Sequence, residues 1–210
     1  MTCLDHLVYA APDLDSAVAA FAAATGVIPE VGGSHTDLGT RNALVTLGDS
    51  YLELIGPDPG QPEPAVARPF GIDELDGPRF VAIGLRPDLG QSIVELVKAA
   101  RLVGFDLGEA FAMQRRGPDG IQLHWRLTMP RLDLGPGVPF LIDWGDTPMP
   151  SGTIGPKAEL VELQVTDRRS DTIRSLHAAL GSEIVVLDVA DRTPPAIRAT
   201  IRGPRGAFSG

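Results

Sequence analysis

The sequence predicts an α+β fold built from repeated strand–helix units. Residues 4–26, 79–104 and 159–181 each show an apolar strand, a turn and an amphipathic helix, in that order. Each of these segments ends near a glycine, where a helix would stop, and short strand-type runs follow. One helix covers only one face of a small sheet, so two such units would turn their other faces toward each other. The repeat therefore predicts a cleft between two sheet faces.

The first unit is assigned to residues 1–58. Its opening segment, LDHLVYAAPDLDSAVAAFAAATG, gives the strand and the helix. Strands are then expected at Ala43–Leu47 and Tyr51–Ile55, joined by Gly48-Asp49-Ser50, which is typical of a tight hairpin turn.

The second unit, 79–146, repeats this order at an offset of 75 residues, set by a shared Pro-Asp-Leu. Strands are expected at 110–114, 121–128 and 140–144. The third unit, 157–210, follows at an offset of 155 and is a partial βαββ unit, with His177 on a solvated helix face. Segments 59–78 and 147–156 are dense in Pro and Gly and are predicted connectors, so we expect one compact domain.

Composition excludes several classes of partner. The 210 residues carry 18 Lys plus Arg against 27 Asp plus Glu, a formal charge of −9, which disfavours nucleic acid. The longest apolar run, Ala17 to Ala24, is far shorter than the ~20 residues that cross a bilayer. The N-terminus has no basic leader, and Cys3 is the only cysteine. We therefore expect a cytoplasmic protein with no membrane partner.

Four segments carry a resemblance to a known family: LDHLVYAAPDLDSAV at the start, GGSHTDLGTRNALVTLGDSYLELIG at 32–56, RFVAIGLRPDL at 79–89 and PFLIDWGD at 139–146. The chain resembles the glyoxalase-like domain group of the vicinal oxygen chelate (glyoxalase/bleomycin resistance/dioxygenase) superfamily. The resemblance implies paired βαβββ units that form a cupped half-barrel around a ligand, with the helices outside.

His6 and Glu53 each place an ionisable group on an otherwise apolar strand face. A buried carboxylate costs several kcal/mol unless it is paired, hydrogen-bonded or bound to a cation. The resemblance implies that a first-strand His and a last-strand Glu bind a divalent metal, and His6 and Glu53 match those positions. Zn²⁺, Mn²⁺, Fe²⁺ and Ni²⁺ all suit such donors. The alternative is a buried His–Glu hydrogen bond without metal.

The second unit departs from this pattern. The offset of 75 places Val81 where the first unit has His6, and aligning YLELI with FLIDW places Ile142 where it has Glu53. Half of the expected ligand set is missing. His35 is a candidate third ligand, because it lies in a glycine-rich segment, 32–37, that could bring a side chain over the cleft.

These residues receive the following expected roles. Glu53 and His35 are candidate catalytic groups, with a buried Glu serving as base. Arg41 and Asn42 are candidates for binding a carboxylate or carbonyl oxygen, although Arg41 could equally pair with Asp37 at the surface. Trp125 and Trp144 are expected either to wall a ligand pocket or to pack in the core.

Three hypotheses remain open. The first is a glyoxalase-like enzyme of lyase, isomerase or dioxygenase type, with or without a metal ion, acting on a small metabolite that contains a carbonyl or vicinal oxygens. The second is a non-catalytic protein of the bleomycin-resistance type that binds or sequesters a small molecule. In the third, which concerns assembly, the third unit covers another unit or joins a second copy in a homodimer.

Overall fold

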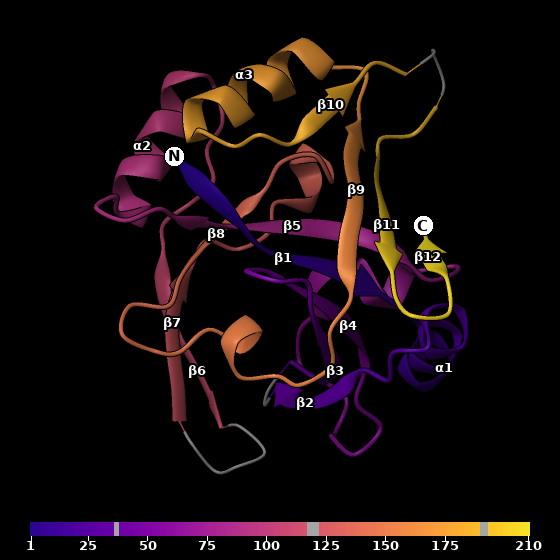
Figure 1. Ribbon diagram of the computed structural model, residues 1–210. Coiled ribbons are helices and arrows are strands. Elements are labelled where there is room, and N and C mark those ends of the chain that lie inside the picture. Colours follow the sequence, from indigo (N-terminus) through magenta and orange to yellow (C-terminus); the bar gives the residue numbers. More distant parts are fainter. Residues whose placement is uncertain (36–37, 117–121, 190–192) are drawn as a thin grey trace.

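The computed structural model describes residues 1–35, 38–116, 122–189 and 193–210, and they form two sheets and three α-helices (Figure 1). The large sheet contains β1 (Thr2–Ala10), β2 (Glu30–His35), β3 (Thr40–Thr46), β4 (Tyr51–Pro57), β5 (Arg79–Pro87), β6 (Phe111–Arg116), β7 (Gln122–Leu127) and β8 (Phe140–Asp143). The small sheet contains β9 (Glu159–Thr166), β10 (Val185–Leu187), β11 (Ala196–Arg202) and β12 (Ala207–Ser209). The helices are α1 (Leu14–Thr25), α2 (Ile93–Leu102) and α3 (Ser170–Leu180).

The large sheet has the strand order β2-β3-β4-β1-β5-β8-β7-β6. In each unit the second strand lies at the edge, the third and fourth follow inward, and the first lies at the centre. Each unit is βαβββ, and the antiparallel pair β1–β5 joins them at the centre. This confirms the predicted α+β fold, in which paired units form a curled half-barrel sheet.

The β1–β5 ladder is symmetric, and its symmetry corrects the offset taken from the sequence. Leu4 pairs with Leu85, and Tyr9 pairs with Phe80, so exchanging the strands relates each residue to the one 76 positions later. The offset of 75 came from the Pro-Asp-Leu turn beyond the strands. The β1–β5 ladder contains two β-bulges, one in each strand. They shift the strand pairing, and this shift cannot be seen in the turn residues from which the offset of 75 was taken.

The helices begin and end at residues whose chemistry favours it. Asp13 accepts a hydrogen bond from the Ser16 backbone N at 3.1 Å and caps α1, which ends at Gly26 with φ 76°. Ser92 and Glu95 form a reciprocal capping box at the start of α2. Both helices bury their apolar stripe against the outer face of the large sheet.

The third unit covers the outer face of the large sheet within the same chain. In Figure 1 its strands β9 and β11 run across β1 and β5, and their apolar side chains share one core with those strands. The Phe208 ring lies 5.1 Å from the Tyr9 ring. His177, expected on a solvated face, is buried: its Nε2 lies 3.0 Å from the Gly137 carbonyl oxygen, and desolvation lowers its pKa.

Other differences from the sequence prediction are local. The glycine-rich segment before His35 forms an edge strand, β2, rather than an open loop. The first connector contains only a short 3₁₀ helix, Pro69–Glu74, which agrees with its assignment as a connector. Ile121, Thr36 and Asp37, which belong to predicted segments, lie outside the described residues.

None of the helices in the described part of the chain combines the length and the apolar character needed to cross a bilayer.

Candidate functional site

The inner face of the curled sheet encloses a cavity of about 440 Å³. Both βαβββ units contribute side chains to its wall, as do both predicted connectors, which supply Phe70 and Pro150. Its volume lies in the range of small-molecule sites, ~300 to 1,000 Å³. The sequence prediction of a cleft between the two units is confirmed, and the cavity is the candidate functional site.

A β-bulge in β1 places two ionisable side chains next to each other on the cavity side. Leu4 pairs with Leu85 and His6 with Gly84, which leaves Asp5 without a partner across the ladder. The side chains of Leu4 and Leu7 therefore both pack on the outer core, three residues apart, with Asp5 and His6 between them. Strict alternation would have separated Asp5 from His6.

Asp5 fixes the orientation of the His6 ring. The carboxylate is 1% exposed, and its Oδ1 lies 2.6 Å from His6 Nδ1. An ionised carboxylate only accepts hydrogen bonds, so Nδ1 carries the proton and donates it. The ring also stacks on Tyr51, with centroids 4.6 Å apart, and meets the Phe140 ring edge-on. The other ring nitrogen, Nε2, is thereby directed at Glu53.

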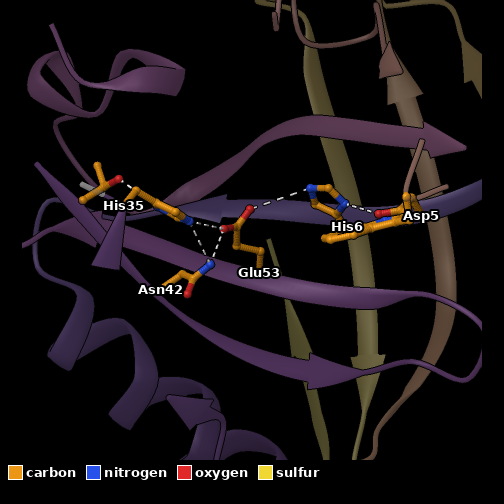
Figure 2. Close-up of polar contacts among 7 residues, drawn as sticks. Asp5, His6, His35, Asn42 and Glu53 are labelled. Carbon is orange, nitrogen blue, oxygen red and sulfur yellow. Dashed lines mark hydrogen bonds and ion pairs between the residues drawn. The ribbon is translucent and has the colours of Figure 1, made fainter. Parts of the chain in front are cut away.

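Glu53 lies between the two histidines, as Figure 2 shows. Its Oε2 is 3.7 Å from His6 Nε2, and its Oε1 is 3.9 Å from His35 Nε2. Asn42 Nδ2 donates to Oε1 at 2.5 Å and lies 3.4 Å from His35 Nε2. The carboxylate is buried, 8% exposed, with this amide as a direct donor. The wall thus presents a desolvated carboxylate to the cavity.

His35 is held at the end of β2 by bonds on both sides of the strand. Its Nδ1 lies 3.0 Å from Thr40 Oγ1 on β3. Its neighbour Ser34 donates to Asp58 Oδ2 at 2.6 Å, and this bond, with one from Gln61, lowers the pKa of Asp58. The segment expected to be flexible is therefore tied to the strands on which the site is built.

Two glycines make room for the site. A methyl group at Gly84 would lie 2.9 Å from His6 Cε1 and 3.0 Å from Phe140 Cζ. At Gly32, beside a shift in the β2–β3 ladder, a methyl group would collide with Asn42 Oδ1. Gly84 is the ladder partner of His6, and Gly32 lies in the bulge next to Gly33, the ladder partner of Asn42; both leave space for the polar side chain.

The second unit reaches the polar groups through Trp144, which donates from Nε1 to Asp5 Oδ2 at 3.0 Å. Trp125 lies beside it, with ring centroids 5.3 Å apart, but its buried Nε1 has no hydrogen-bond partner among the described residues. Both tryptophans line the cavity. Packing and pocket lining, which the sequence left as alternatives, are both roles of Trp144, because it is 7% exposed.

The ladders show which residue of the second unit occupies the place of each polar group. Val8 pairs with Glu53 as Gly84 pairs with Phe140, so Phe140, and not Ile142, is the counterpart of Glu53. With the offset of 76, the counterpart of His6 is Ala82 rather than Val81. The remaining ladders extend the comparison outward. The four pairs are His6 with Ala82, Glu53 with Phe140, Asn42 with Leu127, and His35 with Met113.

The structure places Arg41 away from the cavity. Successive residues of a strand point to opposite faces, so Asn42 faces inward while Arg41 points toward α1. Its guanidinium forms an ion pair with Asp15 at 2.9 Å. The alternative partner considered from the sequence, Asp37, lies outside the described residues.

Residues 4–181 match the family model described as a glyoxalase-like domain. The chain belongs to this family. A hypothetical protein from Staphylococcus aureus shares the fold over the full length of this chain and 85% of its own, with 16% identity and a TM-score of 0.61. Methylmalonyl-CoA epimerase from Mycobacterium tuberculosis matches 66% of this chain and 84% of its own, at 20% identity and a TM-score of 0.41. Methylmalonyl-CoA epimerase from Streptomyces coelicolor matches 71% of this chain and 99% of its own, at 20% identity and a TM-score of 0.44. No curated protein sequence matches the chain.

The donor set of this glyoxalase-like domain does not fit a resident metal ion. His6, Glu53 and His35 come near one another, as predicted, but the two histidines lie on opposite sides of the carboxylate (Figure 2). No group of three or more His, Cys, Asp or Glu side chains in the described ranges could hold a metal ion. The second-unit counterparts Ala82 and Phe140 add no donor atoms.

Sequence reasoning missed Asp5, the buried partner of His6. An acidic residue beside a histidine in an apolar strand was a visible signal. Period-two alternation assigned it to the opposite face, and the bulge that brings it back depends on pairing with β5.

Proposed function

We propose that this glyoxalase-like domain is an enzyme that moves a proton on a small carbonyl compound, with Glu53 as the base. The observation that carries the proposal is the buried Glu53 carboxylate, which faces an apolar cavity between two histidines. A carboxylate fixed against the cavity can accept a proton from the carbon of a bound carbonyl compound.

The proposed step balances without a further reactant. Glu53 takes a proton from the carbon next to the carbonyl, and the electron pair of the broken C–H bond moves onto the carbonyl oxygen. The groups able to donate a hydrogen bond to that oxygen are the Asn42 amide and the ring nitrogens of His6 and His35, when these carry a proton. Return of the proton to the same or a neighbouring atom completes an isomerisation.

Asp5 acts through His6 in this scheme. It holds the proton on Nδ1, so that Nε2 faces Glu53 Oε2 at 3.7 Å. Asp5 is therefore a positioning residue, because His6 lies between it and the cavity.

Hydrogen–deuterium exchange tests the proposal. A panel of small ketones, diketones and hydroxyketones is incubated with the protein in D₂O, and loss of the proton signal next to the carbonyl is followed by NMR. We expect exchange with at least one compound, and a loss of ~10² to 10⁴-fold in its rate for Glu53→Gln. Glu183→Gln, which removes an exposed carboxylate of the third unit, should leave the rate unchanged. Exchange that survives Glu53→Gln would refute the role of Glu53.

A second function, sequestration of a small molecule without chemistry, is favoured by the apolar lining that includes Trp125 and Trp144. Ligand binding without exchange of any carbon-bound proton across the panel would support it and count against the enzyme. A divalent metal is tested separately, by elemental analysis and by titration with Zn²⁺, Mn²⁺, Fe²⁺ and Ni²⁺. Stoichiometric binding that is lost in His6→Ala would show that the predicted ligands hold an ion.

A further inference from the structure

Apart from the indole N–H groups of Trp125 and Trp144, the polar side chains that line the cavity come from the first unit. Glu53 and the three polar side chains in contact with it, His6, His35 and Asn42, all line the cavity. All four come from the first unit. Their second-unit counterparts are apolar, and Phe140, Leu127 and Met113 line the same cavity. A ligand that fills this space meets polar groups at one end and hydrocarbon, sulfur and aromatic rings at the other.

The apolar side is suited to a flat body. Phe111, Trp125, Phe140 and Trp144 contribute rings, and Met113 and Met129 contribute thioethers. Aromatic faces and polarisable sulfur pack well against planar unsaturated groups. Such a body removes this surface from water, which gives the main favourable term in binding.

The charge of the polar end is also defined. Glu53 lines the cavity and Asp5 lies directly behind His6, whereas the described residues that line the cavity include neither lysine nor arginine. Arg41, considered from the sequence as an anion-binding group, pairs with Asp15 outside the cavity. An anionic group next to Glu53 would face a carboxylate in a medium of low dielectric constant, without a fixed cation to offset it.

We propose that the cavity takes an uncharged amphipathic molecule, whose planar apolar body packs on the second unit and whose single oxygen-bearing end meets Glu53 and His6. Carboxylates and phosphates are excluded from that end. This inference names the substrate class of the proposed enzyme and rests on the same cavity, but it concerns binding and does not require that Glu53 move a proton.

Three probes of related structure test the inference by equilibrium dialysis. 1-Phenylpropane-1,2-dione is uncharged, with a planar ring and two vicinal oxygens. Phenylpyruvate has a similar skeleton and carries a carboxylate. Butane-2,3-dione retains the oxygens and lacks the ring. We expect the phenyl dione to bind at least ~10-fold more tightly than phenylpyruvate, because of charge, and at least ~10-fold more tightly than butanedione, because of buried ring area.

Two variants separate the contribution of charge from that of buried ring area. Glu53→Gln should raise the affinity for phenylpyruvate by about 10-fold and that for the phenyl dione by less, since the carbonyl oxygens of the dione carry only partial negative charge toward Glu53. Leu127→Asn should weaken the phenyl dione and leave butanedione nearly unaffected. Glu183→Gln serves as the control for charge removed far from the cavity.

The outcomes are decisive. Phenylpyruvate binding as tightly as the phenyl dione, or no measurable binding of the phenyl dione, would overturn the inference. Selective binding of the phenyl dione without deuterium exchange would uphold the inference and count against the enzymatic function, so failure of one is distinguishable from failure of the other.

Discussion

The two walls of the cavity are built on one plan and differ in chemistry. Each unit presents a strand from the central ladder and three more strands outward from it, in matching register. The first unit places His6, Asn42 and Glu53 on this frame, and the second unit places apolar side chains at the same positions. Both units keep the register and the apolar outer core, while the polar groups of the first wall occupy positions that hold apolar side chains in the second.

The largest effect is expected when the apolar wall of the second unit is made polar. Phe140→Glu places a carboxylate at the counterpart of Glu53, in a side chain position that is 4% exposed. Without a fixed cation nearby, we expect a loss of about 3 to 5 kcal/mol in the free energy of unfolding. Phe140→Leu should cost about 1 to 2 kcal/mol. Urea denaturation measures both. Equal losses would show that the apolar character of this wall is not required.

Gly84 tests how closely the first wall depends on the opposite strand. Gly84→Ala should lower the free energy of unfolding by about 1 to 3 kcal/mol, because its methyl group would press on His6 and Phe140. It should also slow any Glu53-dependent exchange. Gly77→Ala is the matched control, since nothing lies within 4 Å of a methyl group there, and we expect a change within ~0.5 kcal/mol. A harmless Gly84→Ala would mean that His6 has room to move.

The two tryptophans give the finest test. Trp144→Phe removes a donor that bonds Asp5, whereas Trp125→Phe removes one that has no partner among the described residues. Trp144 is buried whereas Trp125 is partly exposed, so both the hydrogen bond and the deeper burial of Trp144 make its replacement the costlier one. We expect Trp144→Phe to cost about 1 to 2 kcal/mol more than Trp125→Phe in thermal unfolding. The reverse order would indicate that the Asp5 carboxylate does not need the second unit.

Much of the fold could be predicted because its signals are local. The helix stripes around Phe21, Leu96 and Leu176 recur at the spacing of a buried face, and all three side chains are buried. The hairpin before Tyr51 carries its own turn residues. The residues of edge strand β2 were not assigned within the expected βαβββ unit, because the glycines that allow its bulge also resemble a loop.

The candidate site was predictable only in part. His6, His35, Asn42 and Glu53 were found, since polar residues in apolar strands are visible in the sequence. Arg41 was grouped with Asn42 although alternation separates their faces, and it pairs with Asp15 instead. Asp5 and the counterparts Ala82 and Phe140 depend on the pairing between strands, which no short segment of sequence specifies.

The bulge at Asp5 has a consequence for how such chains diverge. A substitution in β1 changes one side chain, but loss of the Asp5 codon would remove the bulge and restore alternation while Leu4 and His6 keep their faces. Leu4 would stay in the outer core, and His6 would lose the carboxylate that orients its ring. A relative that had lost the Asp5–His6 pair in this way would show an ordinary apolar first strand, shorter by one residue, and its changed chemistry would appear in an alignment only as a gap.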